Sequence, residues 1–451
     1  MRSRIHLVIV GAVILVAAAC GNRNDEQATT SLTPLEESTR NDLDDLFESL
    51  EDEPDIAALE RLAGVGDPRL GWLFADLLRF IAPTTPLGQA AVVAWEANTG
   101  VDVPADEQVW RYTTDQLIAA DTPAPPTYVR WKSQVFELIE PGWAPFFADG
   151  EATIDWRWIS WGGVLIDDRP IHQTDLGCPR GCIPALDDPG LVSAGTEADW
   201  LADDRLIFGV AVGDEAVALP KNMMEVHEMV NMTIGGRRVA IPYCTLCGSA
   251  QAYFTDSVPD GVALGDAETF EMRTSGLLSR SNKVMFELHT MSVFDTFTGR
   301  AVTGPLRERG VELEQLSVAT STWGAWKQDH PESLLLASDG GIGRSYAADP
   351  LRGRDDDGPI FPIGDVDPRL PVQEPVVGVI QNDGTAVAFP AAEARSVIAN
   401  GSTVVLGAVA LTAAGDGFTA VDTDSGEEYA THEAFWFAWS QFHPDTELWR
   451  P

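Results

Sequence analysis

The sequence predicts an α+β protein in which a helical N-terminal domain is followed by a β-rich domain of two related lobes. Residues 42–150 repeat their apolar residues at helical spacing, and Pro and Gly separate the repeats into short segments. From about residue 151 the pattern changes to short alternating apolar runs with frequent Gly and Pro, which is typical of strands and turns. Several short motifs of this second part occur twice in the same order, which predicts the two lobes.

The composition is that of a packed globular protein. The chain has 451 residues, of which 45% are hydrophobic, and it contains 14 Trp, so two or three domains with sizeable cores are expected. Asp and Glu number 69 against 30 Lys and Arg, which gives a formal net charge of −39. Because phosphate contacts need Lys and Arg, this balance argues against nucleic acid as a partner. An acidic surface is instead expected to keep the protein soluble.

The N-terminus has the features of a bacterial lipoprotein signal. Two arginines precede an apolar run at residues 5–19 that is shorter than a typical spanning helix, and the run ends in VAAACG. We therefore predict a lipoprotein signal peptide at 1–20, lipid attachment at Cys20 and a polar tether at 21–41. The protein is then expected on the extracytoplasmic face of the cell membrane, anchored through its lipid. An ordinary cleaved signal or an N-terminal anchor would also place it outside the cytoplasm.

Residues 42–150 are predicted to form the helical domain. Apolar spacing and the intervening Pro and Gly place helices at 42–50, 56–63, 68–81, 86–98, 106–119 and 127–139. No group of polar residues in this domain indicates a reactive site. Packing, or contact with a protein partner, is therefore its expected role.

One stretch of the β-rich domain, residues 219–250, combines a His, a glycine turn and a CxxC pair. Apolar spacing predicts a helix over 221–230, paired glycines predict a turn over 233–236, and alternation predicts a strand over 237–243. Pro242 lies near the end of this strand. Because proline cannot donate to a sheet ladder, its position predicts a sheet edge or a bulge.

This stretch contains a candidate metal site. Cys244 and Cys247 follow the predicted strand, and His227 would reach them if its helix folds back across the sheet. Thiolates and a neutral imidazole are ligands that suit zinc, or copper in its reduced state. Three such ligands leave one position open, for which Glu228, His289, water or a substrate are the candidates.

The cysteine count leaves other interpretations open. Without Cys20 the mature chain has two pairs, Cys178 with Cys182 and Cys244 with Cys247, in a compartment where disulfides form. The four thiols can form structural disulfides, within each pair or between pairs. They can also form a closed four-sulfur zinc site, or one pair can be a thiol–disulfide exchange site.

An internal duplication predicts the boundaries of the two lobes. The matching segments are VALP and VAFP, DTFTG and DTDSG, and WGAWKQDHP and WFAWSQFHP, at 217–220 and 387–390, 295–299 and 422–426, and 323–331 and 436–444. The first lobe is expected at 151–345, a connecting loop at 346–374 and a second, degenerate lobe at 375–451. Residues shared by both copies are expected to be structural. His227 and the CxxC pair occur in the first copy only and are the better functional candidates.

The ordered motifs of the β-rich part resemble a known bacterial family. These motifs are IPALDDP, VHEMVN, the GG turn, PYCTLCGSA, SGLLSRSN, FTGRAVTGPL and TWGAWKQDHP, which begin at 183, 226, 235, 242, 275, 297 and 322. They are similar to those of the lipoprotein family catalogued as domain of unknown function 3179. The resemblance covers roughly residue 161 to the C-terminus. The family has no established activity, so the resemblance implies only a location and the position of a site.

Two classes of function follow from the sequence. The first is a cell-surface metal binder or metal-dependent enzyme that uses His227, Cys244 and Cys247, with copper or zinc as the candidate cofactor. The second is a disulfide-stapled structural or interaction module without catalysis. No phosphate-binding loop and no Ser-His-Asp order is evident, and the sequence specifies no substrate.

Overall fold

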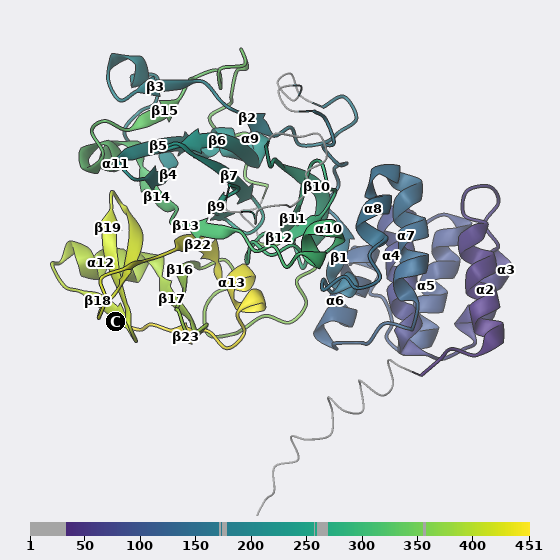
Figure 1. Cartoon of the computed structure of the whole chain (residues 1–451). Coiled ribbons are helices and arrows are strands. Elements are labelled where there is room, and N and C mark those ends of the chain that lie inside the picture. Colours follow the sequence, from purple (N-terminus) through teal and green to yellow (C-terminus); the bar gives the residue numbers. More distant parts are fainter. Residues whose placement is uncertain (1–32, 171–172, 174–177, 257, 259–268, 355–357) are drawn as a thin grey trace, which may run out of the picture.

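The computed structural model describes a helical unit packed beside a β-rich unit (Figure 1). The described residues are 33–170, 173, 178–256, 258, 269–354 and 358–451. The predicted signal peptide, the lipid attachment at Cys20 and most of the predicted tether lie outside them. The first described helix, α2, begins at Glu37, so the helical unit starts earlier than predicted.

In its described part, the helical unit has a helix at each of the six predicted positions and a further short helix at 144–147 that the apolar spacing does not predict. They are α2 (Glu37–Glu48), α3 (Ile56–Ala63), α4 (Gly71–Phe80), α5 (Pro86–Thr99), α6 (Val109–Ala119), α7 (Tyr128–Ile139) and α8 (Ala144–Phe147). Their ends follow local rules, since Asp55 Oδ1 accepts a bond from Ala58 N at 3.0 Å and Gly100 ends α5 with a φ of 71°. No helix in the described part of the chain is long and apolar enough to cross a membrane.

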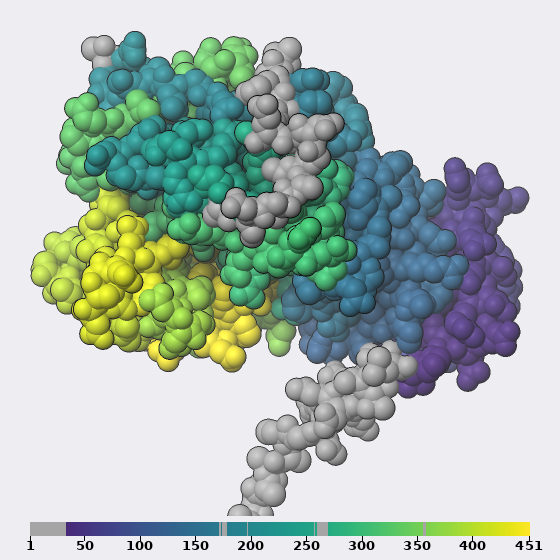
Figure 2. Space-filling view, viewed as in Figure 1, coloured from purple at the N-terminus to yellow at the C-terminus, as the bar shows by residue number. Residues whose placement is uncertain are grey.

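The helical unit packs closely against the β-rich unit (Figure 2). Trp143 Nε1 donates a hydrogen bond to Ser275 O at 2.7 Å, and Arg79 Nε donates to Trp161 O at 2.9 Å. The Arg79 guanidinium also lies 4.8 Å from the centre of the Trp161 ring, a cation–π contact. Aromatic and arginine side chains therefore fasten the helices to the nearest sheet.

The strands in the described ranges form five small sheets. The first sheet has the order β1 (Ile159–Trp161), β10 (Met272–Ser279), β11 (Asn282–Glu287) and β12 (Val293–Asp295). The second has the order β13 (Glu314–Leu316), β9 (Ala252–Phe254), β7 (Arg237–Cys244), β6 (Met229–Ile234) and β2 (Leu186–Asp187), and β8 (Ser249–Ala250) also pairs with β7.

The third sheet has the order β14 (Ala319–Thr322), β4 (Leu206–Val212), β5 (Glu215–Pro220), β15 (Leu334–Leu336) and β3 (Leu191–Ser193). The fourth has the order β22 (Thr431–Phe435), β16 (Pro375–Ile380), β17 (Ala386–Pro390) and β23 (Glu447–Leu448). The fifth has the order β18 (Val404–Leu406), β19 (Val409–Ala414), β20 (Gly417–Asp422) and β21 (Glu428–Tyr429). Short helices connect the strands, namely α9 (Lys221–His227), α10 (Gly304–Glu308), α11 (Trp323–Asp329), α12 (Ala391–Ala399) and α13 (Trp436–Phe442).

The prediction of two related lobes is wrong. The five sheets are arranged like the blades of a five-bladed propeller. The segment around the first Trp and His-Pro motif belongs to the third sheet, and the segment around the second belongs to the fourth. Other parts of the two predicted lobes form the remaining sheets. In both sheets the strand after the His-Pro motif runs parallel to the second strand of the central hairpin.

The two matched tryptophans have similar surroundings in these sheets. Trp326 Nε1 donates to Ser333 Oγ at 2.9 Å, and Trp439 Nε1 donates to Thr446 Oγ1 at 3.0 Å. Each indole lies against a strand glycine, Gly209 or Gly378, where a Cβ would come within 2.5 or 2.1 Å of the ring. These residues are part of the core of the sheets and carry no reactive group.

The predicted helix over 221–230 and the predicted position of Pro242 at a sheet edge or a bulge both need correction. The helix α9 ends at His227, Glu228 has a φ of 52°, and residues 229–234 form β6. Strand β6 is mostly buried, so it lacks the alternation that would have distinguished it from a helix. Pro242 lies inside a sheet, at the point where the neighbour of β7 changes from β9 to β8.

Candidate functional site

Two free thiols meet at the end of β7. Cys244 is the last residue of this strand, and Cys247 follows in a tight turn in which Cys247 N donates to Cys244 O at 3.3 Å. The two Sγ atoms lie 2.8 Å apart, and both residues are buried. The turn therefore holds the sulfurs in contact within the core.

The next residue, Gly248, is required by both the turn and its surroundings. Its φ is 60°, a value that favours glycine, and an added Cβ would lie 3.0 Å from the Phe435 ring. The main chain of Cys247 is held as well, since its carbonyl accepts a bond from Phe435 N at 2.7 Å. The CxxC turn is thus docked onto β22 of the fourth sheet.

The hairpin between β10 and β11 supplies polar groups to Cys247. The Cys247 thiol donates to Asn282 Oδ1 at 2.9 Å and lies 3.4 Å from Ser281 O. Burial and the neighbouring sulfur of Cys244 raise the pKa of the Cys247 thiol well above its usual value. Among the described atoms, Ser281 Oγ and Asn282 Nδ2 are buried without a hydrogen-bond partner. Two polar atoms beside this thiol are therefore able to form further hydrogen bonds.

A buried ion pair adjoins the two thiols. The Lys283 ammonium donates to the carbonyl of Glu228, lies 3.4 Å from Glu228 Oε2, and contacts Tyr243 O at 3.5 Å. Burial lowers the pKa of Lys283, and the negative charges of Glu228 and of the sulfurs of Cys244 and Cys247 oppose that shift. The opposite charges of Lys283 and Glu228 are thus buried beside the two thiols.

Cys244 borders a small pocket that we call the thiol pocket. Its volume is about 80 Å³, and its lining includes Cys244, Glu228, Thr245, Lys283 and Arg354. Thr245 Oγ1 donates to Glu228 Oε1 at 3.2 Å, which positions the carboxylate at the pocket wall. The first cysteine of the CxxC motif therefore lines this cavity, whereas Cys247 is buried and is not among its lining residues.

The structure does not bring His227 to the thiols as a ligand. His227 Nδ1 donates to Pro184 O at 2.8 Å, so Nε2 must accept the hydrogen bond of Tyr346 Oη at 2.7 Å. Burial lowers the pKa of His227 to about 4, in keeping with a neutral ring. Both nitrogens are engaged, and the described ranges contain no group of three or more His, Cys, Asp or Glu side chains that could hold a metal ion.

Glu228, the residue after His227, lies at the thiol site. Because Glu228 adopts a left-handed conformation at the end of α9, its carboxylate reaches Lys283 and Thr245. The sequence names Glu228 only as an additional candidate. His289, the other additional candidate from the sequence, is exposed in the turn after β11, where its N–H donates to Glu287 Oε1 at 3.1 Å.

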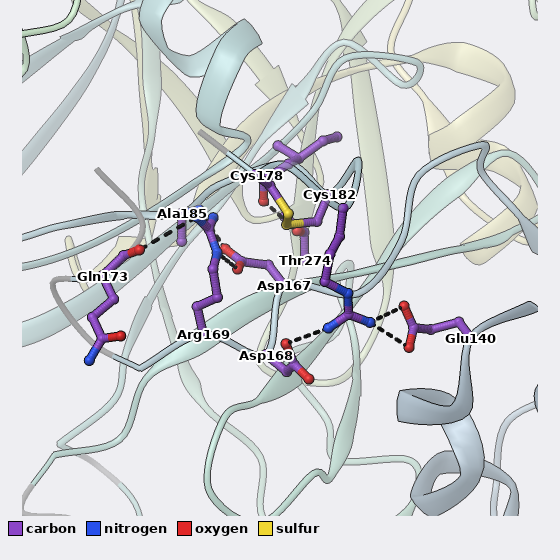
Figure 3. Close-up of a disulfide and its surroundings, with 11 residues drawn as sticks. Glu140, Asp167, Asp168, Arg169, Gln173, Cys178, Cys182, Ala185 and Thr274 are labelled. Carbon is purple, nitrogen blue, oxygen red and sulfur yellow. Dashed lines mark hydrogen bonds and ion pairs between the residues drawn. A yellow bond between two sulfur atoms is a disulfide. The ribbon is translucent and has the colours of Figure 1, made fainter. Parts of the chain in front are cut away.

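The second cysteine pair is a disulfide. Cys178 and Cys182 are bonded to each other, which excludes their use in a four-sulfur zinc site with Cys244 and Cys247. Figure 3 shows that this disulfide lies near Asp167 and Thr274. Arg180, within the loop that it closes, pairs with Glu140 of the helical unit at 2.6 Å. The disulfide therefore holds a loop that contacts both units.

Sequence reasoning missed the residues that surround the thiols. Asn282, Lys283 and Arg354 are distant from the CxxC motif in the chain and belong to no motif of known chemistry. One signal was present, since the chain has only four Lys and one of them, Lys283, directly follows a motif of the family. Nothing in the sequence indicates that Lys283 points at the thiols, because that depends on how the first and second sheets pack.

Comparison with known proteins gives a family and no activity. A family model described as a protein of unknown function (DUF3179) matches residues 180–446, which is more than half of the chain. No curated protein and no solved structure matches the chain. The match includes the CxxC turn, Glu228, Lys283 and Arg354, whereas Gly162 and Val164, which also line the thiol pocket, precede it. The chain belongs to the DUF3179 family.

Proposed function

We propose that Cys244 and Cys247 form a redox couple that alternates between a dithiol and a disulfide. The observation that carries this proposal is the 2.8 Å separation of their sulfurs in a buried turn. A disulfide requires a separation of about 2.05 Å, so bond formation needs a movement of less than about 1 Å. The turn can supply this movement through side-chain torsions.

The same separation disfavours a shared metal ion. With Zn–S bonds of about 2.3 Å at a tetrahedral angle, two sulfur ligands lie about 3.8 Å apart. The sulfurs would have to separate by about 1 Å, and further ligands would have to approach, whereas His227 is engaged by Pro184 and Tyr346. Copper or zinc binding by this pair is therefore the second candidate, and the experiment below tests it directly.

The two thiols have different roles in the proposed couple. Cys244 lines the thiol pocket and attacks the oxidant, while Cys247 is enclosed and completes the protein disulfide. Lys283 stabilises the thiolate, and Asn282 Oδ1 holds the Cys247 thiol in place through its hydrogen bond. A pocket of about 80 Å³ admits only part of a small molecule, and we propose as the oxidant a low-molecular-weight disulfide that is reduced to two thiols.

The proposed location supports this chemistry. The N-terminal apolar run and Cys20 support a lipid-anchored protein on the extracytoplasmic face, where disulfides form and persist. In a Cys20→Ser variant, lipid labelling should be lost and the protein should move to the soluble fraction. Unchanged labelling and membrane retention would contradict the anchor without bearing on the thiol couple.

The internal repeat also supports the choice of site. We infer that the third and fourth sheets derive from a repeated segment, since both carry the W-x-A-W-x-x-x-H-P frame. The CxxC pair has no counterpart in the second copy. A residue that packing alone required would be expected in both.

The decisive experiment measures the thiol state of the purified full chain. The protein is equilibrated in buffers of graded thiol–disulfide potential, quenched in acid and alkylated, and the peptide that carries Cys244 and Cys247 is analysed by mass spectrometry. Both thiols should become resistant to alkylation together, in one two-electron transition, and Cys247→Ser should abolish this transition. Elemental analysis of the same sample should find no stoichiometric copper or zinc. Thiols that remain free at every potential would refute the couple, and stoichiometric metal lost in Cys247→Ser would establish the metal site instead.

A further inference from the structure

A larger polar recess adjoins the thiol pocket. It has a volume of about 430 Å³, which lies in the range of small-molecule sites, and its lining comes from the second, third and fourth sheets and from residues 349–354. A further hollow of about 350 Å³ shares four of its residues, namely Leu206, Lys221, Glu225 and Asp349. We call the 430 Å³ space the polar recess.

Two residues connect the polar recess to the thiols. Thr245 and Arg354 line both the recess and the thiol pocket, and Arg354 Nη2 donates to Thr245 Oγ1 at 2.8 Å. Thr245 is the residue that follows Cys244 in the CxxC turn. A molecule in the recess can therefore contact Arg354 and Thr245, the two residues that separate it from the thiol pocket.

The recess contains carboxylates that are largely shielded from water. The side chain of Glu433 is 12% exposed, and its basic partner, Arg395, is 3.5 Å away. Burial raises the pKa of Glu433 to about 7, and Arg395 only partly opposes this. Glu225, by contrast, is paired with Lys221 at 2.8 Å. An added cation would thus find its best partner at Glu433.

The walls between these charges are aromatic. Phe208, Tyr243 and Phe435 line the recess, and Phe208 and Tyr243 have ring centroids 4.8 Å apart. Such walls suit a short aliphatic chain and also contact with an ammonium group. The recess therefore offers a cationic side chain at its border with the thiols, an acidic side chain within it and apolar surface between them.

We propose that the polar recess binds a small zwitterionic disulfide, with a carboxylate at Arg354 and an ammonium at Glu433, and presents its S–S bond to Cys244. This inference rests on the proposed thiol couple and names its substrate class. An amino-acid disulfide has both charges and a short aliphatic linker to sulfur. A disulfide with only one kind of charge satisfies one of the two contacts.

The reaction is balanced without any other reactant. The Cys244 thiolate attacks one sulfur of the ligand, a mixed disulfide forms, the ligand S–S bond breaks, and the first half leaves as a thiol with the proton from Cys244. The sulfur of Cys247 then attacks Cys244 Sγ, the protein disulfide forms, and the second half leaves as a thiol with the proton from Cys247. Two electrons and two protons pass from the protein to the ligand.

The test compares three dialkyl disulfides of different charge, and each rate is divided by the rate of the same disulfide with a small reference thiol, because the pKa of the leaving thiol also affects the rate. They are cystine, which is zwitterionic, cystamine, which is cationic, and 3,3′-dithiodipropionate, which is anionic. The reduced full chain is mixed with each under anaerobic conditions, and loss of the Cys244 and Cys247 thiols is followed by alkylation and mass spectrometry. Cystine should react at least about tenfold faster than either of the others, which corresponds to one additional charge contact of about 1.4 kcal/mol.

Two variants assign the contacts. In Arg354→Met the rate with cystine should fall about tenfold while the rate with cystamine stays the same, and in Glu433→Gln the rate with cystine should fall while that with dithiodipropionate stays the same. Arg309→Met and Glu427→Gln change exposed side chains outside the recess and serve as matched controls. Circular dichroism establishes that each variant is folded.

The outcomes separate the inference from the function on which it rests. Equal rates for the three disulfides, or variants that slow all three equally, would overturn the zwitterion site and leave the thiol couple standing. Failure of every disulfide to oxidise a pair that also fails the titration in redox buffers would overturn the couple itself.

Discussion

Replacing Lys283 with Gln tests the role of the buried cation beside the thiols. The substitution removes the ion pair with Glu228 at 3.4 Å and the bonds to the carbonyls of Glu228 and Tyr243. The Lys283 side chain is 5% exposed and that of Glu228 is 13% exposed, so the carboxylate would remain mostly buried without its partner. Breaking such a pair costs about 3 kcal/mol. We therefore expect a fall of about 6 °C in melting temperature, at about 2 °C per kcal/mol for a unit of this size.

The assay combines thermal unfolding with the rate of thiol alkylation at neutral pH. Alkylation of Cys244 should be slower in Lys283→Gln, because the thiolate loses its neighbouring positive charge. The matched control is Lys327, whose side chain is 37% exposed and pairs with Asp203, and Lys327→Gln should change the free energy of unfolding by less than about 0.5 kcal/mol.

A double-mutant cycle shows whether the stability loss comes from the pair. If it does, Lys283→Gln combined with Glu228→Gln should be less destabilised than the sum of the single variants by about 1 to 3 kcal/mol. Strict additivity, or an unchanged melting temperature and alkylation rate in Lys283→Gln, would refute the assignment of Lys283 to the thiol site.

Three further predictions concern packing, pH and the Cys178–Cys182 disulfide. Gly378→Ala places a Cβ 2.1 Å from the Trp439 ring and should cost about 1 to 3 kcal/mol in urea unfolding, whereas Gly150→Ala, which meets nothing within 4 Å, should cost little. Because burial lowers the pKa of His227 to about 4 and the unfolded value is about 6.5, the unfolded chain binds a proton that the native state does not between these values. The free energy of unfolding should therefore fall by about 1.5 kcal/mol from about pH 6.5 to about pH 5 through this residue, and His227→Gln should lose that part of the pH dependence; an equal slope in the variant would contradict it. Replacing Cys178 and Cys182 together with Ser opens a very short loop and should cost about 2 kcal/mol while leaving the redox titration of the CxxC peptide intact, and a shifted titration would show that the two pairs are coupled.

Local sequence patterns were sufficient for the helical unit and for part of the site. The helices from α3 to α7 follow from apolar spacing, with Asp55 and Gly100 acting at helix ends, because these interactions join residues a few positions apart. The CxxC turn after a strand is likewise a short-range feature, and the pairing of Cys178 with Cys182 is one of the alternatives that their spacing allowed. The repeat of the Trp and His-Pro motifs also predicted which tryptophans are structural.

The remaining features depended on contacts between distant residues. The region predicted to form two lobes forms five sheets instead. Strand pairing in these sheets joins segments far apart in the chain, such as β14 with β4 and β22 with β16. The sequence ranked His227 as a ligand and Glu228 only as an additional candidate, because apolar spacing does not reveal the left-handed turn at the end of α9 that directs Glu228 toward Lys283.

The order of residues was enough to place a thiol pair at the end of a strand, in an acidic, β-rich chain with a helical N-terminal unit. It was not enough to say what surrounds the pair, because Asn282, Lys283 and Arg354 reach it from the first sheet and from the segment that follows the third. The reactivity of a thiol depends on the charges, hydrogen bonds and solvent access within a few ångströms of it. Those depend on how the sheets pack against one another, and the residues next to the cysteines in the chain do not specify that packing.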